Sequence, residues 1–115
     1  MRRDFSLDSD SPVIRVRTKV WLEIDGNRLI GEGRARLLRL IQETRSINAA
    51  SKIMGISFRR AWAMVKDMED SIKIPLVEKR RGGVGGGTAT LTPTAIELLN
   101  RYEKIFDEFQ SFMNE

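Results

Sequence analysis

The sequence contains neither cysteine nor histidine, and these two absences exclude several classes of function. Without cysteine there is no disulfide framework, and without histidine there is no side chain that readily exchanges a proton near neutral pH. Zinc sites depend mainly on Cys and His, so a structural zinc is not expected. The carboxylates that remain are not clustered along the sequence. We therefore expect no enzymatic activity, no metal and no cofactor.

Long apolar runs are also missing. No stretch approaches the roughly 20 apolar residues that span a bilayer. The first residues, Met1 to Ser6, lack the apolar segment of a secretion signal, which predicts a cytoplasmic location. With 115 residues, of which 41% are hydrophobic and 31% charged, the chain is expected to form one globular domain with its own core.

Charge is unevenly distributed along the chain. The formal net charge is +4 and the sequence pI is near 9.9. From Pro93 to the end there are two basic and five acidic residues, a net charge of −3, so residues 1–92 carry +7. This separation is typical of a protein that places one surface against a polyanion and another against protein. On charge alone, an ordinary basic surface is an equal alternative.

The N-terminal part combines a polar tail with a predicted β-hairpin. Residues 1–12 are polar and without periodicity, which predicts a flexible tail. From Ile14 to Ile24 apolar and polar residues alternate, the period of a half-buried strand. Asp25-Gly26-Asn27 supplies turn chemistry because Gly and Asn tolerate positive φ, and Arg28 to Ile30 form a return strand. Trp21 lies on the polar face of the first strand, which suggests an interface.

A helix predicted over residues 33–43 precedes the most informative stretch, residues 46–72. Ser46 can cap a helix over 47–54, and Gly55 can end it in the left-handed conformation. Ser57 then caps a second helix, whose apolar residues repeat at 3-4 spacing. Those inward residues are Phe58, Ala61, Val65, Met68 and Ile72, and the opposite face carries Arg59, Ala63 and Lys66. Two short helices joined by a Gly-containing turn indicate a helix-turn-helix.

The remaining residues predict a wing and a long helix. Leu76 to Arg81 forms a strand, residues 82–87 a flexible glycine loop, and residues 88–92 the returning strand. A nucleotide phosphate loop is excluded, because that motif needs Gly-Lys before Ser or Thr at a helix start, and here a strand follows the glycines. Thr92-Pro93 predicts the start of a helix over 93–113. Its apolar stripe is wide enough for both the core and a partner helix.

The basic residues of the second helix have an ordinary alternative role as a solvated helix face. The turn, both caps and the following hairpin favour DNA binding instead. Arg59 and Arg60 lie in the first turn, where a guanidinium can reach guanine O6 and N7 bidentately. Trp62 is expected to pack between this helix and a neighbouring element rather than to stack on DNA.

Residues 31–92 resemble the N-terminal winged-helix domain of ModE-type molybdenum-responsive transcription regulators, which are relatives of the LysR DNA-binding domain. The Ile-Ser-aromatic-basic-x-Ala-Trp run occupies residues 56–62, the Leu-Val-Glu-Lys strand 76–79, and the Gly-Gly-x-Gly-Gly-Gly wing 82–87. With the segment around Trp21 and the C-terminal helix, the similarity covers about residues 14–112. Ser51 stands where this family commonly has Ala, a small-for-small change.

The resemblance implies a homodimer whose recognition helices enter successive major grooves. Full-length regulators of this kind carry C-terminal molybdate-binding domains, which a chain ending at Glu115 does not include. It resembles the standalone short form, so we do not expect it to sense molybdate.

The sequence thus predicts an α+β fold, a winged helix-turn-helix with an N-terminal β-hairpin and a long C-terminal dimerisation helix. The tail covers 1–12, the DNA-binding domain 13–92 and the dimerisation helix 93–115. The predicted function is sequence-specific binding of double-stranded DNA by a homodimeric transcription regulator, with residues 57–72 in the major groove and the wing, 76–92, on the backbone or minor groove. The alternative is a winged-helix module for protein–protein interaction.

The predicted site residues form two groups. The DNA-binding group is Ser57, Arg59, Arg60, Ala63, Lys66, Lys79, Arg80, Arg81, Gly85 and Thr88. The dimer-interface group is Trp21, Leu98, Tyr102, Ile105, Phe109 and Phe112.

Overall fold

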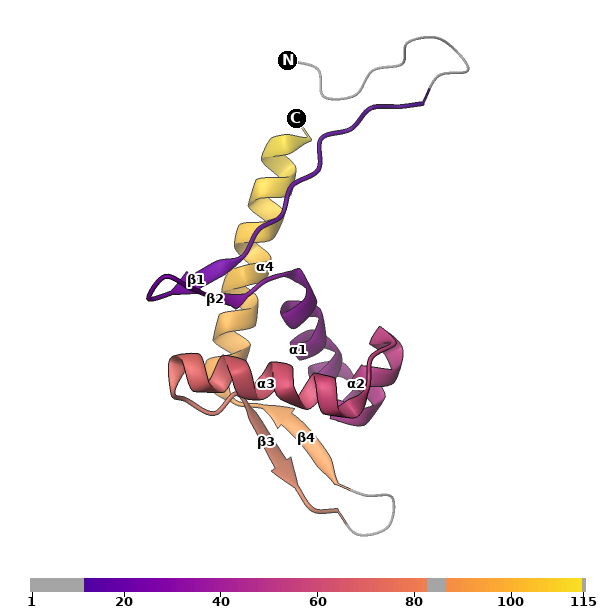
Figure 1. Ribbon diagram of the computed structural model, residues 1–115, viewed down its shortest axis with the longest axis vertical. Helices are drawn as coiled ribbons and strands as arrows, with labels where there is room; N and C mark the ends of the chain where they lie inside the picture. The colour runs from indigo at the N-terminus through magenta and orange to yellow at the C-terminus, as the bar shows by residue number, and fades with distance from the viewer. Residues whose placement is uncertain (1–11, 83–86, 115) are drawn as a thin grey trace.

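The computed structural model describes residues 12–82 and 87–114. Within them the elements are β1 (Leu22–Ile24), β2 (Asn27–Ile30), α1 (Glu32–Thr44), α2 (Ile47–Met54), α3 (Phe58–Ile72), β3 (Val77–Arg80), β4 (Thr88–Leu91) and α4 (Pro93–Met113). Strands β1 and β2 form one antiparallel hairpin, and β3 and β4 form another. Figure 1 shows α1, α2, α3 and the second hairpin gathered at one end of the molecule, with α4 extending away from them. The predicted α+β winged-helix architecture is confirmed.

Helix α1 supplies the centre of the core. Its inner face buries Leu37, Leu38 and Ile41 completely. The side chains that share this core come from β2, α2, α3, the wing and α4, and they include Ile30, Ala50, Val65, Met68, Leu76 and Leu99. Two ion pairs connect α1 to its neighbours: Arg34 pairs with Asp67 of α3, and Arg39 pairs with Glu103 of α4. Apolar burial and these bridges set the position of α3 and α4 against α1.

The predicted turn of the first hairpin is present. Asp25 and Gly26 have φ of 50° and 80°, and they join the paired residues Ile24 and Asn27. Positive φ at both central residues is the geometry that matches the right-handed twist of two strands. Asn27 lies in β2 rather than in the turn.

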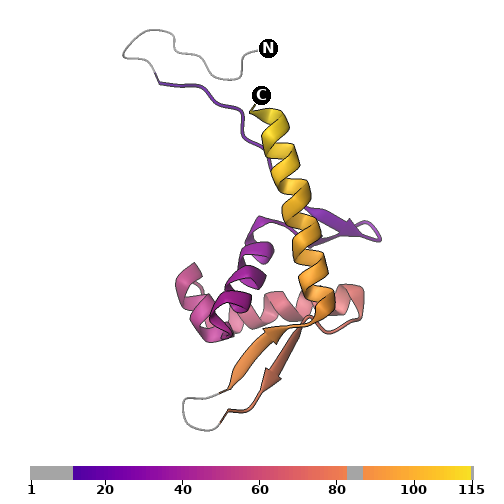
Figure 2. The same ribbon diagram turned by 180° about the vertical axis from the view of Figure 1, so that it is seen from behind.

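The first strand is shorter than its alternation predicts, because β1 begins only at Leu22. Val20, Leu22 and Ile24 pack against the core as expected, whereas Ile14 and Val16 are exposed. A strand needs a neighbour for its backbone hydrogen bonds, and β2 has four residues before α1 begins. The preceding residues run beside α4 instead (Figures 1 and 2). The hydroxyl of Tyr102 donates to the Val20 carbonyl at 3.0 Å and ties the segment to α4.

Thr92 connects the wing to α4. Its side-chain oxygen accepts a hydrogen bond from the Ala95 N–H at 3.2 Å, as an N-cap, and its hydroxyl donates to the Pro75 carbonyl at 2.8 Å. Pro93 occupies the first turn, as the sequence predicts. One buried hydroxyl therefore caps the longest helix and holds the chain that enters β3.

We expect Thr92→Val to lower the free energy of unfolding by about 1–2 kcal/mol, because valine keeps the shape but removes the cap. Urea denaturation followed by circular dichroism measures this change. Thr94→Val is the matched control, since it makes the same replacement two residues later, where the described structure shows no side-chain hydrogen bond. Equal midpoints for the two variants would show that the cap does not stabilise the fold.

Candidate nucleic-acid interface

The turn between α2 and α3 is built by local contacts that the sequence predicts. The Ser46 side chain accepts a hydrogen bond from the Ala49 N–H at 3.0 Å, and Gly55 ends α2 with φ of 72°. The Ser57 side chain accepts from the Arg60 N–H at 3.0 Å and caps α3. Both caps and the glycine C-cap are confirmed. Together they set the angle between the two helices and leave the start of α3 facing outward.

The outer face of α3 is basic at its N-terminal end. Arg59, Arg60 and Ala63 are exposed, and within the described residues neither guanidinium has a hydrogen-bond or ion-pair partner. The positive end of the helix dipole adds to their charge. Lys66 is also exposed, but its ammonium lies 3.6 Å from Glu69 and faces the Trp62 ring at 5.7 Å. Among the described residues, the cationic side chains of α3 without such contacts are therefore those of its first turn.

Phe58 does not face inward as predicted. Ala61, Val65 and Met68 are fully buried and Ile72 packs against the core, but the Phe58 side chain is 43% exposed. As the first residue of α3, it lines an open hollow between the start of α2 and the wing. Its ring instead faces the Lys79 ammonium at 5.6 Å. Trp62 is half-buried and packs against the core, in agreement with its predicted packing role.

The wing carries three cationic side chains with different surroundings. Arg80 and Arg81 are exposed, and no ion pair involves either within residues 12–82 and 87–114. The Lys79 ammonium lies over the rings of Phe58 and Trp62. Thr88, which pairs with Arg80, is exposed. Gly85 and most of the predicted glycine loop, residues 83–86, lie outside the described part of the chain.

Close backbone approach at the wing requires glycine at one position. A Cβ on Gly87 would lie 2.2 Å from the Arg80 carbonyl oxygen, far inside contact distance. Only a residue without Cβ lets the two strands meet here without a shift of backbone. Glycine at position 87 is therefore required for steric reasons, in addition to the backbone flexibility that the sequence predicts for the loop.

Sequence reasoning missed Glu69, which anchors the wing to α3. One carboxylate oxygen accepts hydrogen bonds from the Leu76 N–H at 2.8 Å and the Val77 N–H at 3.2 Å. Nothing in the sequence separates Glu69 from Asp67 and Asp70, because its backbone partners lie seven and eight residues later. At the other side of the wing, the Ala89 N–H donates to the Arg45 carbonyl at 2.9 Å. The wing root is thus held by both α3 and the end of α1.

The predicted dimer residues fall into two sets. Ile105, Phe109 and Phe112 are exposed on the second half of α4, Trp21 is exposed on the N-terminal segment, and Leu98 is half-buried. Tyr102 is 3% exposed, so the structure places it in the core rather than on a surface open to a partner. Burial, together with the negative charge of Glu32, raises its pKa above the usual value of 10.0. Its hydroxyl therefore remains a hydrogen-bond donor across the physiological range.

Trp21 already has contacts within the chain. The Arg28 guanidinium stacks over its ring at 4.1 Å, and its indole N–H donates to Glu23 at 2.9 Å. The side chain nevertheless remains 39% exposed. Its place at an interface stays a prediction.

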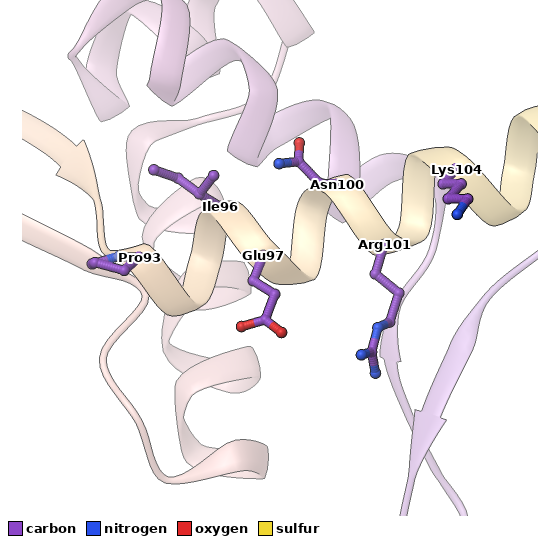
Figure 3. Close-up of a pocket in the computed structure, with 6 residues that line it drawn as sticks. All are labelled: Pro93, Ile96, Glu97, Asn100, Arg101 and Lys104. Atoms are coloured by element: carbon purple, nitrogen blue, oxygen red, sulfur yellow. The ribbon is translucent and has the colours of Figure 1, made fainter.

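A surface hollow along α4 has no catalytic arrangement. Figure 3 shows its lining, six side chains from α4 that point in different directions rather than converging. The hollow is about 590 Å³, and its charged members are Glu97, Arg101 and Lys104. Among the described residues there is no group of three or more Asp and Glu side chains that could hold a metal ion. In the same part of the chain, no helix combines the length and apolarity that a membrane crossing requires.

Comparison with known proteins agrees with this geometry. The family model described as bacterial regulatory helix-turn-helix protein, lysR family, matches residues 33–96, from α1 through the wing to the start of α4. The chain belongs to this family. It therefore contains a LysR-type helix-turn-helix DNA-binding domain, and this family is one of transcription regulators rather than enzymes.

Curated relatives of this LysR-family chain include molybdenum-linked proteins. It is 35% identical over 102 residues to the molybdenum-pterin-binding protein MopB of Rhodobacter capsulatus, covering 83% of the chain and 37% of MopB. It is 41% identical over 70 residues to the transcriptional regulator ModE of Yersinia pestis, covering 61% of the chain and 27% of ModE. The resemblance to ModE-type regulators is confirmed, and the chain spans 27% to 37% of the length of these two relatives.

Solved structures share the fold of this LysR-family domain. The BenM DBD/benA site 1 DNA complex superposes with a TM-score of 0.54 at 18% identity, over 70% of this chain and 84% of that one. Oxidized OxyR of Corynebacterium glutamicum gives a TM-score of 0.54 at 21% identity, over 70% of this chain and 24% of that one. At these identities the likeness establishes the fold alone.

Proposed function

We propose that this chain acts as a homodimer that binds double-stranded DNA sequence-specifically and regulates transcription. Helix α3 enters the major groove, and the wing lies along the backbone or in the minor groove. The observation that carries the proposal is that Arg59 and Arg60, in the first turn of α3, are exposed and have no partner among residues 12–82 and 87–114. Unpaired guanidiniums on a capped, core-anchored helix have the reach and the preorganisation for base recognition.

The wing extends the proposed DNA-binding surface that begins at the first turn of α3. In Figure 1 it extends from beneath α3, at the end of the molecule opposite the C-terminus of α4. Arg80 and Arg81 are exposed on it, so a duplex that contacts the start of α3 meets positive charge on the wing as well. The relation to ModE regulators and the fold shared with BenM in its DNA complex support this arrangement. The sequence predicts contacts at Ser57, Ala63, Lys66, Gly85 and Thr88 in addition.

The experiment that tests the function is selection of binding sites from a random duplex library with the purified protein. We expect a roughly palindromic consensus, because a two-fold dimer presents two copies of α3. Enrichment of no sequence by a folded, dimeric protein would contradict the proposal. That result would favour the alternative, a winged-helix module for protein–protein interaction.

Arg80→Ala and Arg81→Ala are each expected to weaken binding to specific and non-specific duplexes alike. Each variant should flatten the slope of log K against log salt by about one, because one fewer phosphate is neutralised. Fluorescence anisotropy with a labelled duplex at several salt concentrations measures both quantities. Lys104→Ala removes an equal charge from α4 and should leave the slope unchanged. Altered sequence preference at an unchanged slope would assign the wing arginines to base readout instead.

A further inference from the structure

Lys79 is exposed, but its side chain lies on the face of β3 that is turned toward the recognition helix. Side chains two residues apart in a strand share a face, so Lys79 lies on the same side of β3 as the buried Val77. Glu78 and Arg80 lie on the other side. Across the hairpin Lys79 pairs with Ala89, whose small buried side chain leaves room beside it. The geometry of the wing thus separates Lys79 from its neighbour Arg80.

The Lys79 ammonium faces two aromatic rings of α3. It lies 4.7 Å from the centre of the Trp62 ring and 5.6 Å from the centre of the Phe58 ring. Both distances are within the roughly 6 Å at which a cation is attracted by the negative face of a ring. Phe58 and Trp62 are four residues apart and so share one side of α3. This arrangement accounts for the exposed Phe58, which the helical pattern alone places in the core.

We propose that Lys79 is a positioning residue that fixes the angle between the wing and the recognition helix. Held over Phe58 and Trp62, it ties the middle of β3 to the first turns of α3, while Glu69 ties the start of β3 to the end of α3. On β4 the Ala89–Arg45 hydrogen bond holds the residue paired with Lys79 against the end of α1, and Lys79 adds a contact from β3 to α3. Contacts from both strands resist rotation of the wing more than a contact from one strand. Lys79 therefore contributes to DNA binding by placing Arg80, not by a phosphate contact of its own. The DNA-binding part of this inference rests on the proposed function, but the contact itself does not.

The first test compares salt dependence in the full chain with a selected duplex. Lys79→Met is expected to weaken binding about three- to tenfold while changing the salt slope by well under one. Lys79→Arg should restore the affinity, because a guanidinium also stacks on aromatic rings. Arg80→Met is the matched control on the other face of β3 and should flatten the slope by about one. A Lys79→Met variant whose slope falls by one would overturn the proposal and make Lys79 a phosphate ligand.

The second test removes a ring instead of the charge. Phe58→Leu is expected to give part of the affinity loss of Lys79→Met, because the Trp62 ring remains, although no charge is removed. The double variant should bind no more weakly than Lys79→Met alone. Fully additive losses would show that the two residues act independently and would overturn the proposal. If Phe58→Leu does not fold, as judged by circular dichroism, the comparison of Lys79→Met with Lys79→Arg decides.

The third test needs no DNA, so it separates this inference from the proposed function. In the free protein the ε-methylene protons of Lys79 should resonate upfield of those of the other lysines, because they lie over two rings. Phe58→Leu should reduce this upfield shift. Ordinary Lys79 resonances would overturn the proposal even if DNA binding is demonstrated. A shifted resonance in a protein that selects no DNA would leave the contact established and the proposed function wrong.

Discussion

Replacing Phe109 and Phe112 with aspartate should convert the proposed dimer to a monomer and abolish tight binding to a palindromic site. Ile105, Phe109 and Phe112 follow one another at spacings of four and three residues, so they form a seam on one side of α4. The seam is open in the monomer, where Phe109 is 46% and Phe112 62% exposed. In the proposed dimer the same helix of a second copy covers this seam.

The expected loss follows from charge burial and from geometry. Two aspartates per helix would bring uncompensated carboxylates into the seam, which costs more than the contact supplies. A dimer places two recognition helices about 34 Å apart, one turn of duplex, and each half-site contributes its own contacts. The monomer loses one half-site and the effective concentration that links the two. Size exclusion with multi-angle light scattering measures the mass, and circular dichroism measures the retained fold.

The control for this variant lies on the same helix. Ile96→Asp makes a similar change roughly 140–160° around α4 from the two phenylalanines, in the hollow of Figure 3. It should remain dimeric and bind normally. A wild-type protein that is monomeric at micromolar concentration, yet binds one non-palindromic site tightly, would refute the dimer proposal.

Arg59→Ala should weaken specific binding by about 1–3 kcal/mol and relax preference at one base pair of each half-site. Arg59 is exposed in the first turn of α3 and has no partner within the described residues that would compete for its guanidinium. A bidentate contact to guanine is lost completely on truncation, since alanine offers no donor. Affinity for the consensus and for its single-base variants, measured by anisotropy, gives both quantities. Arg60→Ala should act in the same way or, if Arg60 contacts phosphate, weaken all sequences alike.

The matched control is Arg36→Ala, which removes an exposed arginine from the outer face of α1. It should leave the base preference unchanged and the affinity within about twofold. Circular dichroism should show that all three proteins keep their helices. Unchanged affinity for the consensus in both Arg59→Ala and Arg60→Ala would show that the start of α3 is not the reading surface.

Much of the secondary structure of this protein can be predicted from short-range patterns in its sequence. Ser46, Gly55, Ser57 and Thr92 act at the positions that the sequence predicts, and α2 and α4 have the predicted bounds. The reason is that a cap or a helix end depends on groups within about four residues. The hairpin at Asp25-Gly26 is local in the same sense. From the sequence, therefore, the order of elements, the helix-turn-helix and the family could all be predicted.

Only the tertiary structure decided which side chains are buried between elements and which stay exposed. Phe58 and Tyr102 differ from the prediction in opposite ways: Phe58 is exposed beside the wing lysine Lys79, and Tyr102 is buried against the N-terminal segment. The alternation from Ile14 continued past the end of the available partner strand, so only Leu22–Ile24 became β1. Glu69 and Lys79 acquired their roles from residues of other elements. Periodicity reports which side of an element is apolar, but the packing of its neighbours determines how far along that side the cover extends.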